Sequence, residues 1–410
     1  MAQINPERLL RDLKTLREFG RHGTGVIRQA LSPVDMESRR WLVQRMIDAG
    51  LDADIDGLGT IIGRSPNPGR ALLIGSHTDT QPTGGWLDGA MGVIYGLEIA
   101  RSFAETEDTH SLAVDVASWI DEEGAFMGLM GSKAFCGMLD ETTMMGATNA
   151  SNQTLQSALR DAGLLGRERQ SLDKTRFLGY LEAHIEQGPY LEDENKRIGI
   201  VTSIVGIRQH EIVFEGEQNH AGTTPMSKRK DAGRALTDFA SLVHRQFAES
   251  VGPNSVWTIG DIRLEPGAPS IVPGRARLLL QYRDGDESML DTLTERVHAL
   301  VEESNSSGVV GVRIGREGEW STAAKMDENL LMHLRQAAQQ HAPEAWMDMP
   351  SAAGHDAQVL ANYLPSAMLF VPSIGGISHA FQEDTAEADI VLGCQVMADA
   401  AASILRGTTQ

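Results

Sequence analysis

The sequence contains a scattered set of imidazole and carboxylate side chains that could bind divalent metal ions. A neutral imidazole is the commonest metal ligand in proteins, and carboxylates complete many such sites. Taken singly, each short cluster has an ordinary structural explanation, such as a strand end or a solvated turn. Taken together, they supply nitrogen and oxygen donors that suit two zinc, manganese, cobalt or nickel ions. The candidate ligands are His77, Asp88, Glu123, His184 and His379.

Two further acids stand beside these ligands and could take part in chemistry. Glu122 directly precedes Glu123, and adjacent carboxylates cannot both be buried and ionised without a cation or a proton nearby. One could therefore bind a metal while the other acts as a base on a water molecule. Asp79 follows His77 by two residues. We expect its carboxylate to orient the imidazole by accepting a hydrogen bond from the second ring nitrogen.

The segments that precede two of these clusters predict buried strands. Residues 71–75 and 112–119 are apolar runs, and a helical stretch at about 90–100 lies between them. This alternation predicts an α/β fold, in which a mixed, mostly parallel sheet is flanked by helices. Such a fold would place His77 and Asp121-Glu122-Glu123 at the carboxyl ends of strands, where ligand sites gather in open sheets.

Further helices are expected along the chain. At the start of the chain, Asn5 can cap the first turn of a helix and Pro6 suits its first position. The segment around His184, with apolar Leu181 and Ile185 on either side, indicates a half-buried stretch. The other expected helices cover residues 34–49, 326–341 and 386–406.

The middle of the chain follows a different pattern. Residues 209–318 predict the order strand, helix, strand, strand, helix, strand, which is typical of an α+β ferredoxin-like (βαββαβ) domain. We therefore expect residues 209–320 to form a separate domain inserted between residues 1–208 and 321–410. A hinge is expected at Gly206.

The composition excludes several classes of function. Lys+Arg (36) minus Asp+Glu (56) gives a net charge of −20, which argues against nucleic acid and anionic membranes as partners. Two cysteines cannot build a disulfide scaffold or a cysteine-based zinc site. The first 20 residues are polar and amphipathic, and we saw no apolar run of the length that spans a membrane. A cytoplasmic location is therefore expected.

Seven ordered motifs resemble those of the hydantoinase/carbamoylase-type amidohydrolases. This family includes N-carbamoyl-L-amino-acid hydrolases, β-ureidopropionase-like enzymes and allantoate amidohydrolases, and it is related to dinuclear zinc aminopeptidases and aminoacylases. The resemblance covers nearly the whole chain. The motifs are GSHTDTQPTGGWLDGAMGV, DEEG…GSKAFCG, EAHIEQGPYLE, NHAGTTPMSKRKDA, VPG…QYRD, AAGHDA and GISHAFQEDT.

The resemblance implies a role for each candidate residue of the metal site. His77, Asp88 and His184 would hold one ion, and Asp88 would bridge to a second ion held by Glu123 and His379. Glu122 would be the general base that takes a proton from the attacking water. Asp79 would orient His77.

The resemblance also implies how a substrate is held. Residues 209–320 would form a lid or dimerisation domain inserted in a catalytic domain of residues 1–208 and 321–410. His220, on this inserted domain, would reach into the partner subunit's site and stabilise the developing oxyanion. Arg283 would grip the substrate carboxylate, and Gln187 would contact the ureido or amide end. The backbone at Gly375 and Gly376 would line the carboxylate pocket, and His355 lies near the site in a less defined role.

Two departures from the family pattern bear on the substrate. The family's EEGxRF arginine is missing, because Ala125-Phe126 follows Gly124 directly. Ser270 stands where many members carry an asparagine that contacts the substrate, so the hydrogen-bonding arm is shorter. The metal site is intact, which leaves the reaction class unchanged.

We therefore expect a dinuclear, metal-dependent homodimeric amidohydrolase for an anionic ureido or amide substrate. The leading substrate is an N-carbamoyl-L-amino acid, which would give the amino acid, CO2 and ammonia. The alternatives are an allantoate or ureidoglycolate amidohydrolase and an N-acyl amino acid deacylase or dipeptidase. More remote ones are a phosphoesterase and a non-catalytic metal-binding homologue, although the latter would have no need for Glu122.

Overall fold

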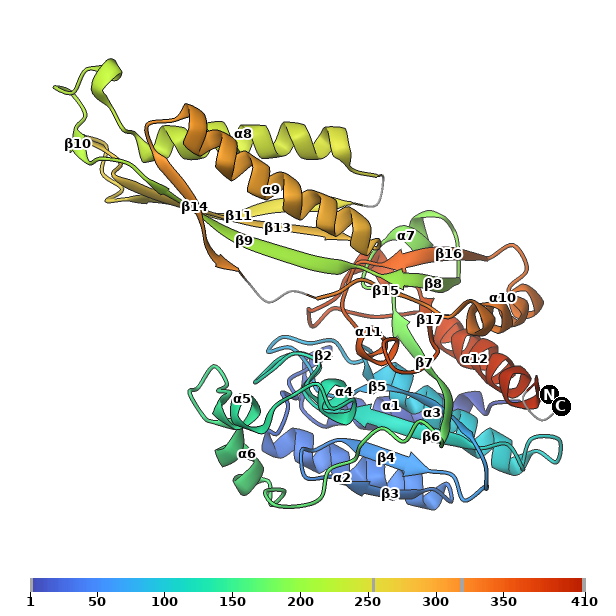
Figure 1. Cartoon of the computed structure of the whole chain (residues 1–410). Coiled ribbons are helices and arrows are strands. Elements are labelled where there is room, and N and C mark those ends of the chain that lie inside the picture. Colours follow the sequence, from blue (N-terminus) through green and yellow to red (C-terminus); the bar gives the residue numbers. More distant parts are fainter. Residues whose placement is uncertain (1–2, 253–254, 318–320, 408–410) are drawn as a thin grey trace. The chain divides into compact units, whose positions relative to one another are not determined.

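The computed structural model describes residues 3–252, 255–317 and 321–407 (Figure 1). The chain divides into two compact units. One consists of the described residues of Met1–Ser203 and Lys325–Gln410, and the other is Ile204–Ala324. The assignment of 209–320 as a separate domain remains a prediction, and its limit at residue 320 lies outside the described residues, as do residues 1, 2 and 408–410.

The larger unit is built on a mixed sheet. Among the described residues its strand order is β15-β8-β17-β7-β5-β6-β4-β3, with β16 paired to β8. The central strands β17, β7, β5 and β6 run parallel to one another, while β8, β4 and β3 pair antiparallel. The predicted mixed, mostly parallel sheet is confirmed. Its strands are β3 (Asp52–Ile55), β4 (Ile61–Arg64), β5 (Ala71–His77), β6 (Val114–Trp119), β7 (Phe177–Ile185), β8 (Ile198–Ile204), β15 (Ala324–Lys325), β16 (Trp346–Ser351) and β17 (Ser366–Val371).

Helices flank this sheet, and their starts follow from local sequence. Asn5 accepts a hydrogen bond from the Arg8 N–H and caps α1, and Ser32 accepts one from Asp35 and caps α2. Proline follows each cap, where its missing N–H costs nothing. The long helices are α1 (Pro6–Glu18), α2 (Pro33–Asp48), α3 (Ala90–Glu105), α10 (Glu328–His341) and α12 (Glu387–Gly407); the short ones are α4 (Met130–Phe135), α5 (Glu141–Gly146), α6 (Leu155–Asp161), α7 (Tyr190–Asp193), α11 (Asp356–Leu360) and the 3-10 turn η2 (Ile374–Gly376).

Helix α12 is more apolar than we expected from the sequence, in which we saw no apolar run of the length that spans a membrane. It is long and apolar enough to cross a membrane by length and composition, and 61 % of its most apolar window is buried inside the protein. It packs against α10 and β17, as the core helix of a globular unit does. Length and hydropathy alone therefore give only weak support for a membrane span.

The second unit has its own sheet and its own core. Its elements are β9 (Gly206–Glu215), α8 (Ala232–Ser250), β11 (Val256–Glu265), β13 (Arg275–Asp284), α9 (Glu287–Ser307) and β14 (Gly311–Glu317). The sheet order is β11-β13-β9-β14, and every described pairing in it is antiparallel. Inward-facing residues of β9 and β13 pack with both helices around a core that includes Phe214, Phe239 and Phe247. A short ribbon, β10 (Asn219–His220) with β12 (Ile271–Val272), extends the unit.

The sequence missed several strands of the larger unit. The expectation of a half-buried segment around His184 is wrong, because β7 lies between β17 and β5 and is almost wholly buried. Its polar residues Glu182 and His184 interrupt the apolar run that marks a buried strand. β3 and β4 have only four residues each, which is too short for a clear alternation.

Candidate metal centre and active site

The five candidate ligands gather at one edge of the central sheet. His77 ends β5 and His184 is the next-to-last residue of β7. Glu123 follows β6, Asp88 lies in the turn before α3, and His379 lies in the loop after β17. Parallel strands end at the same edge of a sheet, so this topology alone brings together side chains that are far apart in sequence.

The ligand atoms form two groups that share Asp88. His77, Asp88 and His184 form one group, and Asp88, Glu123 and His379 form the other, with the ligand atoms of each group within 4.8 Å of one another. Asp88 Oδ1 lies 3.4 Å from His77 Nε2 and 3.0 Å from His184 Nε2. Asp88 Oδ2 lies 3.4 Å from His379 Nε2, which is 3.8 Å from Glu123 Oε2. One carboxylate thus faces both groups, one oxygen to each.

The turn that carries Asp88 requires glycine at its next position. Gly89 has φ +63°, and a Cβ there would lie 2.3 Å from His77 Nε2. Both the backbone conformation and the close approach of the imidazole exclude a side chain.

Backbone acceptors fix the tautomers of the two buried imidazoles. His77 Nδ1 lies 3.0 Å from the Asp79 carbonyl oxygen, and His184 Nδ1 lies 2.9 Å from that of Ile185. A carbonyl can only accept, so each Nδ1 carries the proton and each Nε2 presents a lone pair. The predicted acceptor for His77 was the Asp79 carboxylate, whereas the structure uses the Asp79 main-chain carbonyl.

The Asp79 carboxylate instead holds the acidic segment after β6. It accepts hydrogen bonds from the main-chain N–H of Asp121 at 3.0 Å and of Glu123 at 3.3 Å. Arg39 Nη2 lies 3.6 Å from it, with both side chains fully buried. Asp79 therefore links β5 to the segment that carries Glu122 and Glu123.

Asp121 fixes the rest of this segment. It has φ +57°, and its carboxylate accepts hydrogen bonds from the N–H groups of Ala125, Phe126 and Met127 at 2.6, 2.9 and 2.7 Å. The loop lacks the arginine of the EEGxRF pattern, yet three N–H donors on one carboxylate still define its path.

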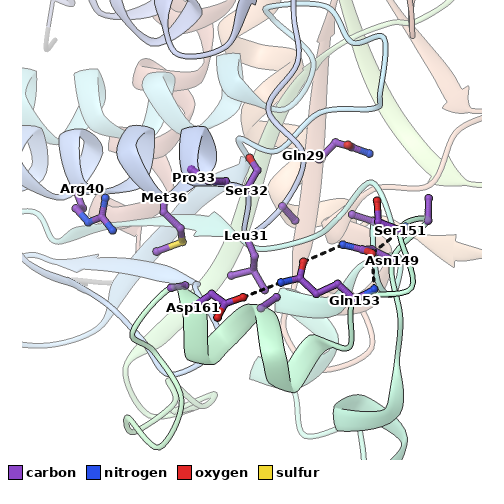
Figure 2. Close-up of a pocket in the computed structure, with 15 residues that line it drawn as sticks. Gln29, Leu31, Ser32, Pro33, Met36, Arg40, Asn149, Ser151, Gln153 and Asp161 are labelled. Carbon is purple, nitrogen blue, oxygen red and sulfur yellow. Dashed lines mark hydrogen bonds between the residues drawn. The ribbon is translucent and has the colours of Figure 1, made fainter.

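A separate cavity lies beside this loop (Figure 2). It has a volume of about 440 Å³. None of the described residues that line it is a candidate metal ligand. Gln153 spans one wall, where it bonds to both Asn149 and Asp161. Its other lining residues include Leu31, Ser32 and Met36 at the start of α2, and Ala125.

The charges of the site call for a cation. Burial raises the pKa of Glu122 well above its usual range, and the nearby Glu123 charge adds to this. Burial, followed by the charge of Asp88, raises the pKa of Glu123 to about 7. Burial opposes ionisation of Asp88 as well, but the neighbouring imidazoles of His184, His379 and His77 hold its pKa well below normal. Acids crowded in this way are satisfied by divalent ions, and imidazole and carboxylate donors fit such ions.

Glu122 differs from the ligands in its surroundings. Its Oε2 lies 3.7 Å from His77 Nε2, and 11 % of its side chain is exposed. It belongs to neither ligand group. A carboxylate that borders the ligands without joining them is placed to accept a proton.

Gln187 contacts the Asp88 carboxylate directly. Its Nε2 donates to Asp88 Oδ2 at 3.0 Å and to Ser378 Oγ at 3.1 Å, and it lies 3.3 Å from His379 Nε2. Its predicted role at the ureido or amide end of a substrate remains a prediction.

The three other predicted substrate contacts of this unit belong to neither ligand group. The N–H groups of Gly375 and Gly376 already donate to Glu192 Oε2 and to the Ser373 carbonyl, so any pocket lining there must use other atoms. His355 is 2 % exposed, bonds to Ser351 at 2.9 Å and packs edge-on against the His184 ring.

The remaining predicted residues lie in the second unit. His220 Nδ1 accepts hydrogen bonds from the N–H groups of Gly222 and Thr223 at 3.0 and 3.1 Å, which leaves the proton on Nε2. The Ser270 carbonyl pairs with the Ala221 N–H at 2.9 Å, so Ser270 and His220 are neighbours on one ribbon. Arg283 donates from Nε to Gln281 Oε1 at 3.1 Å, and burial lowers its pKa.

Sequence reasoning missed four residues that support the ligands: Arg39, Gln81, Asp121 as a clamp, and Glu383. Gln81 donates to Glu123 Oε2 at 2.7 Å. Glu383 accepts from the Asp88 N–H at 3.1 Å. Gln81, Asp121 and Glu383 lie inside the motifs, but the motifs carry no signal for their partners. Gln81 and Glu383 bond to residues of distant loops, and Asp121 bonds to main-chain N–H groups.

The family of this chain follows from its match to a protein-family model. The model of peptidase family M20/M25/M40 matches residues 73–403. The chain belongs to this family. The M20 chain is 32% identical to an N-carbamoyl-L-amino-acid amidohydrolase of Paenarthrobacter aurescens over 97% of each chain. It is 30% identical to an allantoate amidohydrolase of Bacillus subtilis (strain 168), over 94% of this chain and 95% of the relative.

The solved structures agree with the resemblance seen in the motifs. An amidase of the hydantoinase/carbamoylase family from Burkholderia phymatum is 52% identical, with a TM-score of 0.94 and 99% of each chain covered. The predicted resemblance of this M20 chain to hydantoinase/carbamoylase amidohydrolases is confirmed, and so is its class as a hydrolase of C–N bonds in linear amides.

Proposed function

We propose that the protein is a dinuclear metal-dependent amidohydrolase that cleaves an N-carbamoyl-L-amino acid or a similar ureido acid. The observation that carries this proposal is the position of Asp88, with one oxygen toward each ligand group, and Glu122 beside them. The M20 family is metal-dependent, and relatives over nearly the full chain are named for this activity.

The residues divide the work of hydrolysis among them. When bound, two divalent ions would polarise the scissile carbonyl and lower the pKa of a water toward ~7. Glu122 takes a proton from the attacking water and returns it to the leaving nitrogen. One ureido group and one water then give the amino acid, CO2 and ammonia. The ions that suit the donor set are zinc, manganese, cobalt and nickel.

Three residues of the second unit complete the proposed site. His220 carries its proton on Nε2 and would donate to the developing oxyanion in the partner subunit's site. Such a donor is typically worth ~3–4 kcal/mol in the transition state. Arg283 would hold the substrate carboxylate with its planar fork, and Ser270, beside His220, would contact the substrate.

A homodimer through the second unit follows from this assignment. Strand β11 is an edge of its sheet and exposes three large apolar side chains, Val256, Ile262 and Leu264, at 56%, 50% and 43%. An exposed apolar edge is a template for pairing with another strand. We therefore place the dimer contact at β11. The net charge of −20 favours neither nucleic acid nor membrane partners, and we expect a cytoplasmic protein.

The test is an ammonia-release assay on metal-free protein reconstituted separately with manganese, cobalt, nickel and zinc. The substrates are N-carbamoyl-L- and D-amino acids, β-ureidopropionate, allantoate, ureidoglycolate and N-acetyl amino acids. We expect ammonia from N-carbamoyl-L-amino acids and no turnover without metal.

The other outcomes separate the alternatives. Turnover of allantoate or ureidoglycolate alone would reassign the substrate within the same reaction class. Hydrolysis of N-acetyl amino acids without ammonia would indicate a deacylase. Absence of turnover on the whole panel with every metal would contradict the proposal.

A further inference from the structure

A buried carboxylate, Glu383, joins the two loops that carry the second ligand group. It lies in the loop between η2 and α12 and is 1% exposed. Its Oε1 accepts hydrogen bonds from the main-chain N–H of Asp88 at 3.1 Å and of Leu87 at 3.4 Å. Its Oε2 accepts the hydroxyl proton of Ser378 at 2.9 Å, and Ser378 directly precedes His379. The same side chain therefore holds both the Asp88 turn and the His379 loop.

These contacts close into a ring. Gln187 Nε2 donates to Ser378 Oγ and to Asp88 Oδ2, so Asp88, Glu383, Ser378 and Gln187 are linked in a circle. The donors and acceptors agree around it, because the Ser378 hydroxyl gives its one proton to Glu383 and accepts from Gln187. A ring with every member satisfied has one well-defined geometry.

The two loops also fit together with no spare room. A Cβ on Gly85 would lie 1.8 Å from Glu383 Oε1. Beside it, Trp86 Nε1 donates to Asp384 Oδ1 at 3.2 Å. The turn at residues 85–88 thus packs directly against residues 383–384. Any side chain at Gly85 must therefore displace the Glu383 carboxylate.

From this geometry we infer that Glu383 is a positioning residue that sets the spacing of Asp88 and His379 and thereby the affinity of the second cation site. The inference rests on the proposed metal centre. Glu383 belongs to neither group of candidate ligands among the described residues, so it acts through Asp88 and Ser378. Partners that orient ligands in this way typically contribute 10–100-fold to metal affinity.

The first site should be much less sensitive. His77 and His184 are oriented by the carbonyls of Asp79 and Ile185. Glu383 bonds instead to Leu87, Asp88 and Ser378. Asp88 Oδ1 faces those two imidazoles, and we expect these contacts to remain when Glu383 is replaced. Loss of Glu383 should therefore weaken the binding of the second ion and leave the affinity for the first ion nearly unchanged.

The experiment titrates metal-free full-length protein with zinc and with manganese by calorimetry, and measures bound metal after dialysis by elemental analysis. The variants are Glu383→Gln, Glu383→Leu and Gly85→Ala. We expect the second ion to bind ~10–100-fold more weakly in Glu383→Leu and Gly85→Ala. Bound metal after dialysis should fall from near two ions to near one per chain.

Glu383→Gln should be milder, because its amide oxygen can still accept from the Asp88 N–H while its NH2 faces Ser378. Gly85→Ala keeps every charge and every polar group, so it tests geometry alone. A graded loss across the three variants, with the first ion bound as in the wild type, is the expected pattern.

Asp56→Asn is the matched control. Asp56 is a buried carboxylate, 4% exposed, that accepts main-chain N–H bonds from Leu58, Gly59, Thr60 and Gln170. It resembles Glu383 in burial and bonding but touches no ligand. Its substitution should lower the unfolding temperature of the metal-free protein without changing the affinity for either ion.

Other outcomes overturn the inference in distinguishable ways. If the wild type binds two ions and the Glu383→Leu and Gly85→Ala variants bind the second ion equally well, Glu383 does not position the site. If these variants lose both ions equally, or if Asp56→Asn does the same as they do, the role is general stability. If the wild type itself binds fewer than two ions, the proposed dinuclear function fails together with the inference.

Discussion

The neighbouring glutamates after β6 show how surroundings assign different tasks to identical side chains. Glu123 receives a hydrogen bond from Gln81 Nε2 and faces His379, which is the situation of a ligand. Glu122 lies nearest His77 and is part of neither ligand group. The sequence showed that one of two adjacent acids must be compensated, and the structure shows which neighbours each one has.

Replacement of Glu122 by Gln should abolish turnover while both ions stay bound. A general base typically contributes 10²–10⁴-fold to rate, so we expect kcat to fall by about that factor. Replacement of Glu123 by Gln should instead reduce the bound metal toward one ion. Steady-state kinetics and elemental analysis on the same samples separate the two effects, and an active Glu122→Gln variant would refute the assignment of the base.

His210 makes the stability of the second unit depend on pH. Burial lowers its pKa from 6.5 to about 4, with further lowering by the charges of His298 and Arg208. The unfolded chain takes up a proton near pH 6.5 that the folded chain refuses until about pH 4, so stability is lost as pH falls through this window. Between pH 7 and pH 5 this amounts to about 2 kcal/mol.

Urea unfolding of wild type and His210→Gln at both pH values checks this expectation. The variant should lose less stability on acidification than the wild type. Tyr282→Phe is the control, because it removes the hydroxyl 3.0 Å from His210 Nε2 but keeps the imidazole. Equal pH dependence in wild type and His210→Gln would show that another group titrates.

At the scale of elements, α2 contacts the strands of the candidate site through one buried arginine. Its Arg39 is fully buried and bonds to Asp35 at 3.0 Å and to the carbonyls of Gly59 and Trp119 at 3.0 and 3.1 Å. It also lies 3.6 Å from Asp79. One guanidinium therefore connects a helix to the ends of two strands. Its neighbour Asp79 in turn bonds to the acidic segment.

Replacement of Arg39 alone should lower the free energy of unfolding by more than replacement of Arg39 and Asp35 together. Arg39→Met leaves Asp35 buried and unpaired, which typically costs about 3–5 kcal/mol of folding free energy. The double variant Asp35→Asn/Arg39→Met should cost less than the sum of the two single variants. Chemical unfolding measures both, and strictly additive costs would contradict a coupled pair.

The elements differ in how far their sequence reveals them. Helices α1 and α2 were predictable because Asn5 and Ser32 cap them locally. Strand β7 was not, because its polar residues Glu182 and His184 break its apolar run. The strand-end position of the candidate ligand His77 was likewise predictable, whereas the acceptor of His77 was not. That acceptor is a main-chain carbonyl, which has no signature in a sequence.

At the scale of the molecule, the proposed dimer makes a quantitative prediction about shared sites. Glu122→Gln and His220→Ala should each be inactive alone. If His220 serves the partner's site, mixed dimers of the two variants contain one intact site of two. Random exchange then restores about a quarter of wild-type activity.

The measurement is an activity assay after the two variants are mixed, unfolded and refolded together. A mixture of Glu122→Gln with Glu122→Gln/His220→Ala is the control and should stay inactive. No recovery in dimers that have demonstrably exchanged would place His220 in its own subunit's site or outside any site.

The two crossings between the units lie close together. The Met326 N–H donates to the Thr202 carbonyl at 3.0 Å, and β8 pairs with β15 at the same place. The strand that leaves the larger unit is thus the neighbour of the strand that returns to it. A tight hairpin between these two ends would remove Ile204–Ala324 and keep all five candidate ligands in one shorter chain, a scaffold into which a different domain could later be inserted.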